Sequence, residues 1–160
     1  MRKTGLTAAA IVAVALLTGP RGTGADDQGP DHQGCSEKTL RGSYGIQIQG
    51  TRPAPPPALP GTIETVIGVI VRHYDGDGNF TQVNNEKGSV SGSAPVDREG
   101  AGTYQVNEDC TGSHQLQPSG SPITVVDRFV VVDRGREVRS FVVSPAPVMV
   151  TGVSRRIGIR

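Results

Sequence analysis

Apolar and polar residues alternate at every second position through much of this chain, a pattern typical of β-strands with one buried face. The segments that show this alternation, or a short apolar run, are 44–48, 63–72, 80–84, 103–106, 114–116, 123–133, 138–143 and 148–154. No stretch after residue 25 keeps a 3.6-residue apolar period, so helix is poorly supported. The pattern predicts an all-β protein of about eight strands.

Turn signals separate these segments at short, fairly even spacing. Residues 75–79 (DGDGN), 107–109 (NED) and 133–136 (DRGR) are rich in the residue types that form tight turns. Eight antiparallel strands can close into a barrel or stack as a β-sandwich. A sandwich needs long cross-connections, and only 51–61 is long enough for one. We therefore predict an antiparallel up-and-down barrel, with the β-sandwich as the alternative.

The N-terminus has the pattern of an export signal. Arg2 and Lys3 precede an apolar run over 6–17, and small residues at 23–25 suit cleavage. A membrane span needs about 20 apolar residues, more than this run supplies. The sequence thus predicts a signal peptide at 1–25, a flexible tail at 26–34 and one domain at 35–160. The mature chain is expected to be secreted or periplasmic, without a membrane span.

The charge balance of the chain argues against nucleic acid as a partner. The chain has 16 Lys and Arg against 15 Asp and Glu. Loss of Arg2, Lys3 and Arg21 with the signal peptide leaves 13 basic residues, so the mature net charge is −2. No basic patch emerges, and nucleic acid is not an expected partner.

Cys35 and Cys110 are the only cysteines. An even count in an exported protein predicts a disulfide, with two free thiols as the alternative. Neither cysteine has a histidine or a second cysteine at ligand spacing, so no metal site is expected there. The 75–86 segment partly matches a calcium loop, but Phe80 stands where the loop needs glycine, which favours a plain turn. No catalytic motif or cofactor-binding motif is present, so neither catalytic residues nor cofactors are predicted.

Inward-facing residues of a barrel are the candidates for binding a ligand. Taking the more apolar face of each strand as the inner one predicts this lining: Tyr44, Ile46, Ile67, Val69, Tyr104, His114, Leu116 and Phe129. Asp127 alternates in phase with apolar residues of its segment, and Arg128 interrupts the other face. A polar lumen, a β-bulge that turns the charge outward, or a charged outer face would each account for this.

Five pieces of the chain together resemble a known group of proteins: the signal peptide, 35–45 (CSEKTLRGSYG), 75–80 (DGDGNF), 102–112 (GTYQVNEDCTG) and 150–156 (VTGVSRR). They resemble small secreted bacterial proteins of unknown function that carry a G-T-Y-x-V-N-x-D-C-T-G segment. The resemblance implies a barrel of calycin or allene-oxide-cyclase-like shape and brings no activity with it. The chain lacks tryptophan, and so lacks the Gly-x-Trp signature of true lipocalins.

These observations predict a secreted, non-enzymatic barrel that binds a small apolar or amphipathic ligand in its mouth. The first alternative is a structural or surface-interaction protein whose barrel is filled by side chains. The second is an isomerase- or cyclase-type enzyme, for which Asp127 and His114 are the candidate polar groups. The sequence does not indicate an oligomeric state.

Overall fold

The computed structural model describes residues 34–158. The predicted signal peptide and nearly all of the predicted tail lie outside these residues. The elements in chain order are η1 (Glu37–Leu40), β1 (Gly42–Pro53), β2 (Ile63–Tyr74), β3 (Asn79–Gly88), β4 (Gly92–Ser93), β5 (Arg98–Val106), β6 (Thr111–Pro118), β7 (Val125–Val132), η2 (Asp133–Gly135), β8 (Glu137–Ser144) and β9 (Met149–Ile157). Among the described residues, no helix is long and apolar enough to cross a membrane.

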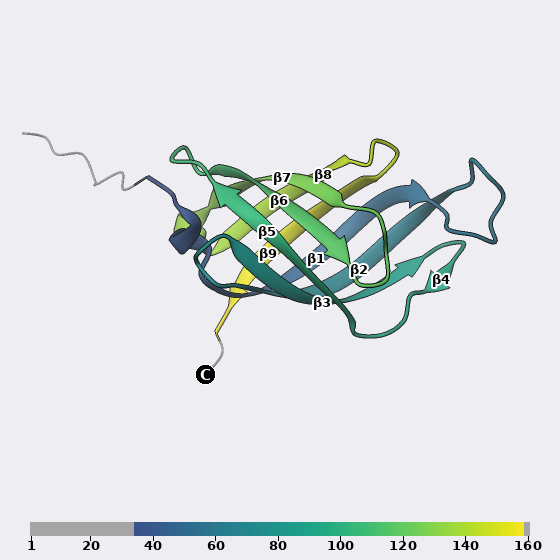
Figure 1. Ribbon diagram of the computed structural model, residues 1–160, viewed down its shortest axis with the longest axis horizontal. Helices are drawn as coiled ribbons and strands as arrows, with labels where there is room; N and C mark the ends of the chain where they lie inside the picture. Colours follow the sequence, from purple (N-terminus) through teal and green to yellow (C-terminus); the bar gives the residue numbers. More distant parts are fainter. Residues whose placement is uncertain (1–33, 159–160) are drawn as a thin grey trace, which may run out of the picture. The chain divides into compact units, whose positions relative to one another are not determined.

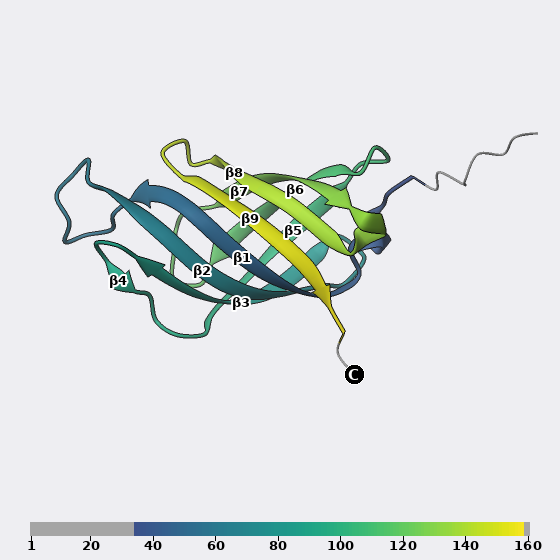
Figure 2. The same cartoon turned by 180° about the vertical axis from the view of Figure 1, so that it is seen from behind.

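The strands form a closed antiparallel barrel (Figures 1 and 2). Each of the eight barrel strands pairs with the next in the chain, except that the short β4 is attached to β3 and the chain returns from it into β5. The last strand, β9, then pairs with β1 from Ser43↔Ile157 to Thr51↔Met149 and closes the sheet. The predicted barrel of about eight strands is confirmed, and the β-sandwich alternative is wrong.

One end of the barrel is covered by η1, a 3-10 helix that the sequence pattern does not predict (Figure 1). Leu40 of η1 is fully buried, and the Tyr104 hydroxyl donates to the Glu37 carbonyl over 2.9 Å. The predicted disulfide joins Cys35, just before η1, to Cys110 in the turn between β5 and β6. The loop between β1 and β2, together with β4, lies at the opposite end (Figure 1).

The lumen is packed unequally along its length. We call the η1 end the closed half; its inward side chains are buried and largely aromatic, and they include Tyr44, Ile46, Tyr74, Phe80, Tyr104, Val106, His114, Phe129, Val131 and Val138. We call the other end the open half; its inward side chains include several that are only half-buried, namely Ile48, Arg52, Glu86, Arg98, Leu116, Val125, Asp127, Ser140, Val142 and Val150. Tight aromatic contacts fill the closed half, with Tyr74 lying edge-on to Tyr44 and Tyr104 at centroid distances of 5.3 and 4.8 Å.

The structure corrects the predicted inner face of β2. Ile67 and Val69 lie on the outer surface and are 56% and 61% exposed, while Val66 and Ile70 are buried. The register with β1 places Ile46 beside Ile70, which fixes the even-numbered residues inside. The even face carries Glu64 and Arg72, so counting apolar residues selects the wrong face. Both charges are accommodated because the lumen gives each of them hydrogen-bond partners.

Candidate functional site

The wall of the open half combines an apolar side with a charged side. The apolar side comes from β1 and from β6 to β9, and the charged side comes from the ends of β1, β2, β3 and β5. Inward side chains of a closed barrel are screened from outside by their own strands. We therefore attribute the remaining exposure of Leu116 and Val142 to the mouth of the barrel, whereas Ile48 also lines a hollow on the outer surface with Ile67 and Val69.

The charged side is an ion cluster made of Arg52, Glu64, Glu86 and Arg98, which we call the rim cluster. Arg52 bridges both carboxylates, with Nε 2.9 Å from Glu64 and Nη1 2.8 Å from Glu86. Arg98 Nη2 lies 3.3 Å from the other oxygen of Glu86. The two cations and two anions of the cluster balance one another. The cluster thus leaves no net charge to attract a ligand.

Glu64 also fastens the chain beside β4. Its carboxylate accepts hydrogen bonds from the backbone N–H groups of Val90 and Ser91 and from the Ser91 hydroxyl. The Ser91 backbone N–H, ahead of the Arg52 and Ser91 side chains, lowers the pKa of Glu64 to about 2, against the opposing effect of burial. Glu64 is therefore ionised at neutral pH, and its role in the fold is structural.

A chain of hydrogen bonds crosses from the closed half to the open half. Arg72 Nη1 donates to the Tyr74 hydroxyl at 3.3 Å, and that hydroxyl lies 2.8 Å from His114 Nε2. His114 Nδ1 lies 2.5 Å from Asp127 Oδ1. Arg72 is held in turn by two hydrogen bonds to Gln82 Oε1, at 2.9 and 2.7 Å, and by the ring of Phe80. We call Arg72, Tyr74, His114 and Asp127 the polar chain.

The direction of the donors in the polar chain fixes the protonation of His114. A guanidinium can only donate, so the Tyr74 oxygen accepts from Arg72 and its proton is directed at His114 Nε2. Nδ1 then carries the imidazole proton and donates it to Asp127. Burial, followed by the positive charge of Arg72, lowers the pKa of His114 to about 4, although Asp127 acts in the opposite direction. His114 is therefore a neutral imidazole at pH 7.

Asp127 lies where the polar chain reaches the open half. Its cross-strand neighbours are His114 on β6 and Val142 on β8, and the β7–β8 register shifts beside it between Val126 and Asp127. Despite this irregularity Asp127 faces the lumen, and Arg128 is exposed outside. Of the three explanations for the charge at 127, the polar lumen is correct.

The 75–79 segment is a turn built around one side chain. Asp75 Oδ1 accepts the backbone N–H groups of Asp77 and Asn79, and Oδ2 accepts the Asn79 amide. These hydrogen bonds, led by the one from the Asn79 side chain, lower the pKa of Asp75. Within residues 34–158, no three His, Cys, Asp or Glu side chains converge as a metal site would require.

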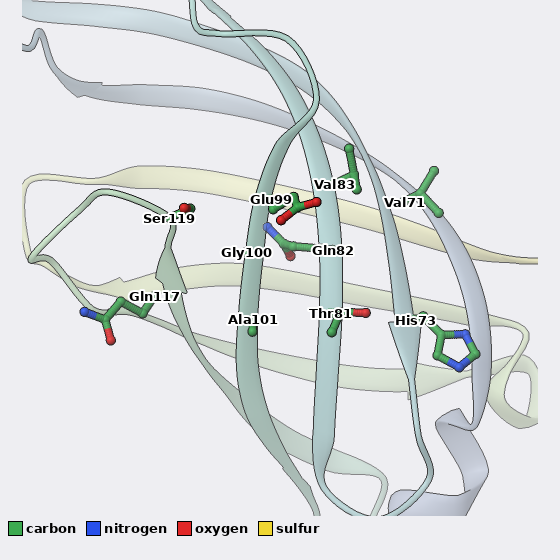
Figure 3. A pocket seen from close by; sticks show the side chains of 10 residues that line it. All are labelled: Val71, His73, Thr81, Gln82, Val83, Glu99, Gly100, Ala101, Gln117 and Ser119. Atoms are coloured by element: carbon green, nitrogen blue, oxygen red, sulfur yellow. The ribbon is translucent and has the colours of Figure 1, made fainter.

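The outer surface carries a separate hollow across β2, β3, β5 and β6 (Figure 3), which we call the outer hollow. Its volume is about 630 Å³. Val71 and Val83 are exposed in it at 52% and 37%, and His73 lies beside them with its Nδ1 3.0 Å from the Ser43 hydroxyl. His73 therefore faces outward, on the same side of β2 as Ile67 and Val69.

The structure separates the predicted lining residues into three groups. Tyr44, Ile46, Tyr104 and Phe129 are packed in the closed half, and His114 lies with them in the polar chain. Leu116 lines the open half. Ile67 and Val69 lie outside, so the prediction that they line the lumen is wrong.

The sequence interpretation missed the charged residues of the lumen. Arg52, Glu64, Arg72, Glu86 and Arg98 all face inward. Glu86 was considered only as the last position of the partial calcium loop, and the other four belong to no sequence motif. Glu64 and Arg72 share a face of β2 with Val66 and Ile70, and this shared face is the one signal that could have placed Glu64 and Arg72 inside.

Compared with known proteins, the chain matches no protein-family profile, no curated protein and no solved structure.

Proposed function

We propose that this protein is a secreted, non-enzymatic barrel that binds a small apolar or amphipathic molecule in the open half of its lumen. The observation that carries the proposal is the unequal packing of the lumen. The aromatic side chains of the closed half are buried, while Leu116, Val142 and Val150 on the inner wall of the open half are partly exposed. Apolar side chains with a few convergent polar groups are typical of small-molecule sites.

Secretion belongs to the same proposal. The predicted signal peptide supports it, and so does the Cys35–Cys110 disulfide, because disulfides persist in oxidising compartments. The likeness to small secreted bacterial barrels of calycin type is proposed on the sequence segments that carry it, and the closed antiparallel barrel is compatible with that likeness.

A bulky residue inside the mouth tests the binding proposal. Val142→Trp adds an indole to the inner wall of the open half, so we expect ligand affinity to fall at least about tenfold, or about 1.4 kcal/mol, and the ligand-bearing fraction to fall with it. Native mass spectrometry of protein purified from its host measures that fraction as added mass. Val143→Trp is the matched control, because Val143 is the next residue of β8 and is 41% exposed. Wild-type protein without added mass, or equal loss in both variants, would count against the proposal.

The second candidate is a structural role in which the outer face of β2 contacts a second copy of the chain. Exposed apolar residues follow one another along this face, with Ile63, Ile67, Val69 and Val71 each more than half exposed. Clustered exposed apolar residues mark interaction surfaces. We expect Val69→Lys to weaken such self-association about tenfold, which corresponds to about 1.4 kcal/mol. Sedimentation velocity over a concentration series measures it, and a monomer at every concentration excludes this role.

A further inference from the structure

Asp127 has an unusual position among the charged groups of the lumen. The carboxylates of Glu64 and Glu86 each touch an arginine, whereas Asp127 touches the neutral His114. The cation of the polar chain, Arg72, is separated from Asp127 by Tyr74 and His114. Among the inward-facing carboxylates of the described barrel strands, Asp127 is thus the one without a cation in contact.

One oxygen of Asp127 is available to a ligand. Oδ1 receives the proton of His114, and Oδ2 has no partner among residues 34–158. Within these residues, no buried side-chain oxygen lacks a hydrogen-bond partner, so Oδ2 reaches solvent. The side chain is 15% exposed, against 2% for His114. The accessible oxygen therefore belongs to a largely enclosed carboxylate at the mouth of the barrel.

A partly buried carboxylate is usually paired, because the hydration it loses is costly. Here His114 Nδ1 donates to one oxygen of Asp127, and the other oxygen is left open. Val142 is the cross-strand neighbour of Asp127 on β8, and Leu116, two residues after His114 on β6, faces the same lumen. A cation carried by an apolar molecule would complement both features.

We propose that Asp127 binds the protonated amine of an apolar ligand held in the open half of the barrel. This inference rests on the proposed binding function and specifies the chemistry of its ligand. The amine donates to Oδ2, and the hydrocarbon part lies against the apolar wall. The polar chain acts by positioning the carboxylate: His114 holds Oδ1, and Tyr74 and Arg72 hold His114.

Three probes of equal chain length test the anchor: 1-octylamine, 1-octanol and octanoate, titrated calorimetrically into the purified chain at pH 7.5. We expect octylamine to bind at least about tenfold more tightly than octanol, since a charge-assisted hydrogen bond is about twice as strong as a neutral one. Octanoate should bind most weakly. Asp127→Asn keeps an oxygen for His114 but removes the charge. It should weaken octylamine at least about tenfold and leave octanol within about twofold.

Glu99→Gln is the control, because it removes a carboxylate from the exposed outer side of β5. It should leave all three affinities unchanged. Should Asp127→Asn fail to fold, carboxyl-carbon NMR of wild type decides instead: the Asp127 signal must shift with octylamine and stay in place with octanol. Equal binding of octylamine and octanol overturns the anchor alone. Absence of binding by all three probes counts against the binding function as well.

Discussion

Replacing Cys110 by serine should lower the free energy of unfolding by about 4 kcal/mol under oxidising conditions. Cys35 and Cys110 are separated by 75 residues, and closing a loop of that length restricts the unfolded chain by about this amount. The disulfide also ties η1 to the β5–β6 turn, where the Cys35 N–H donates to the Glu108 carbonyl and Val106 N–H donates to the Glu37 carboxylate. Loss of the bond therefore weakens the cover of the closed half.

Urea denaturation of wild type, Cys110→Ser, Cys35→Ser and the double variant measures this effect. Because the two cysteines share one bond, the double variant should cost no more than either single variant. In thermal unfolding, we expect the melting temperature of Cys110→Ser to lie below that of wild type by on the order of 10 °C. An unchanged midpoint, or two titratable thiols in the folded wild-type protein, would contradict the expectation.

Acid should destabilise the protein by a route that depends on His114. The folded state lowers the pKa of His114 from 6.5 to about 4. Between these values the unfolded chain binds more protons than the folded one, so stability falls as pH falls. The contribution of His114 is complete above pH 6.5 and is lost as the pH approaches 4. From pH 7 to pH 4.5 the loss amounts to about 2–3 kcal/mol.

His114→Gln removes this proton-binding site while keeping groups that can donate and accept. Its free energy of unfolding should be lower at pH 7, because the stacking of His114 on Phe129 at a centroid distance of 4.3 Å is lost. The informative quantity is the slope from pH 7 to 4.5, which should be flatter than in wild type. The control Gln115→Asn changes the outward-facing neighbour of His114 and should keep the wild-type slope.

Parallel stability curves for wild type and His114→Gln would show that His114 is not held neutral in the folded protein. Glu64 does not confound the comparison, because its stabilisation is lost only as pH falls from about 4.5 towards 2.

The alternation of apolar and polar residues predicted an all-β protein, and the short turn spacing favoured the barrel over the sandwich, because a meander of short hairpins uses local signals. The turn at 133–136 and the pairing of Cys35 with Cys110 were predictable for the same reason: turn chemistry and cysteine count are visible in the chain. The 3-10 helix η1 was not predictable, since four residues give no period and its burial depends on Leu40 reaching the end of the barrel.

The apolar pattern of β2 does not predict which of its faces points into the lumen. Its odd positions are more apolar than its even ones, yet the even positions face inward, because Arg72 meets Gln82 on β3 and Glu64 meets Arg52 on β1. Such partners come from other strands and depend on register. The candidate site was therefore only partly predictable. Asp127 and His114 were candidate polar groups because each shares a strand face with apolar residues, but their hydrogen bond depends on the register of β6 with β7.

The pairing of β9 with β1 has a consequence for how the barrel forms. Every other barrel-strand pair joins strands that follow one another in the chain, apart from the short β4 between β3 and β5. Only β1–β9 joins residues from opposite ends of the domain. Loop-closure entropy is therefore concentrated in this single seam. We expect the hairpins to assemble successively and the β1–β9 seam to join last, so hydrogen-exchange protection should appear later at the β9 amides that bond to β1 than at those that bond to β8.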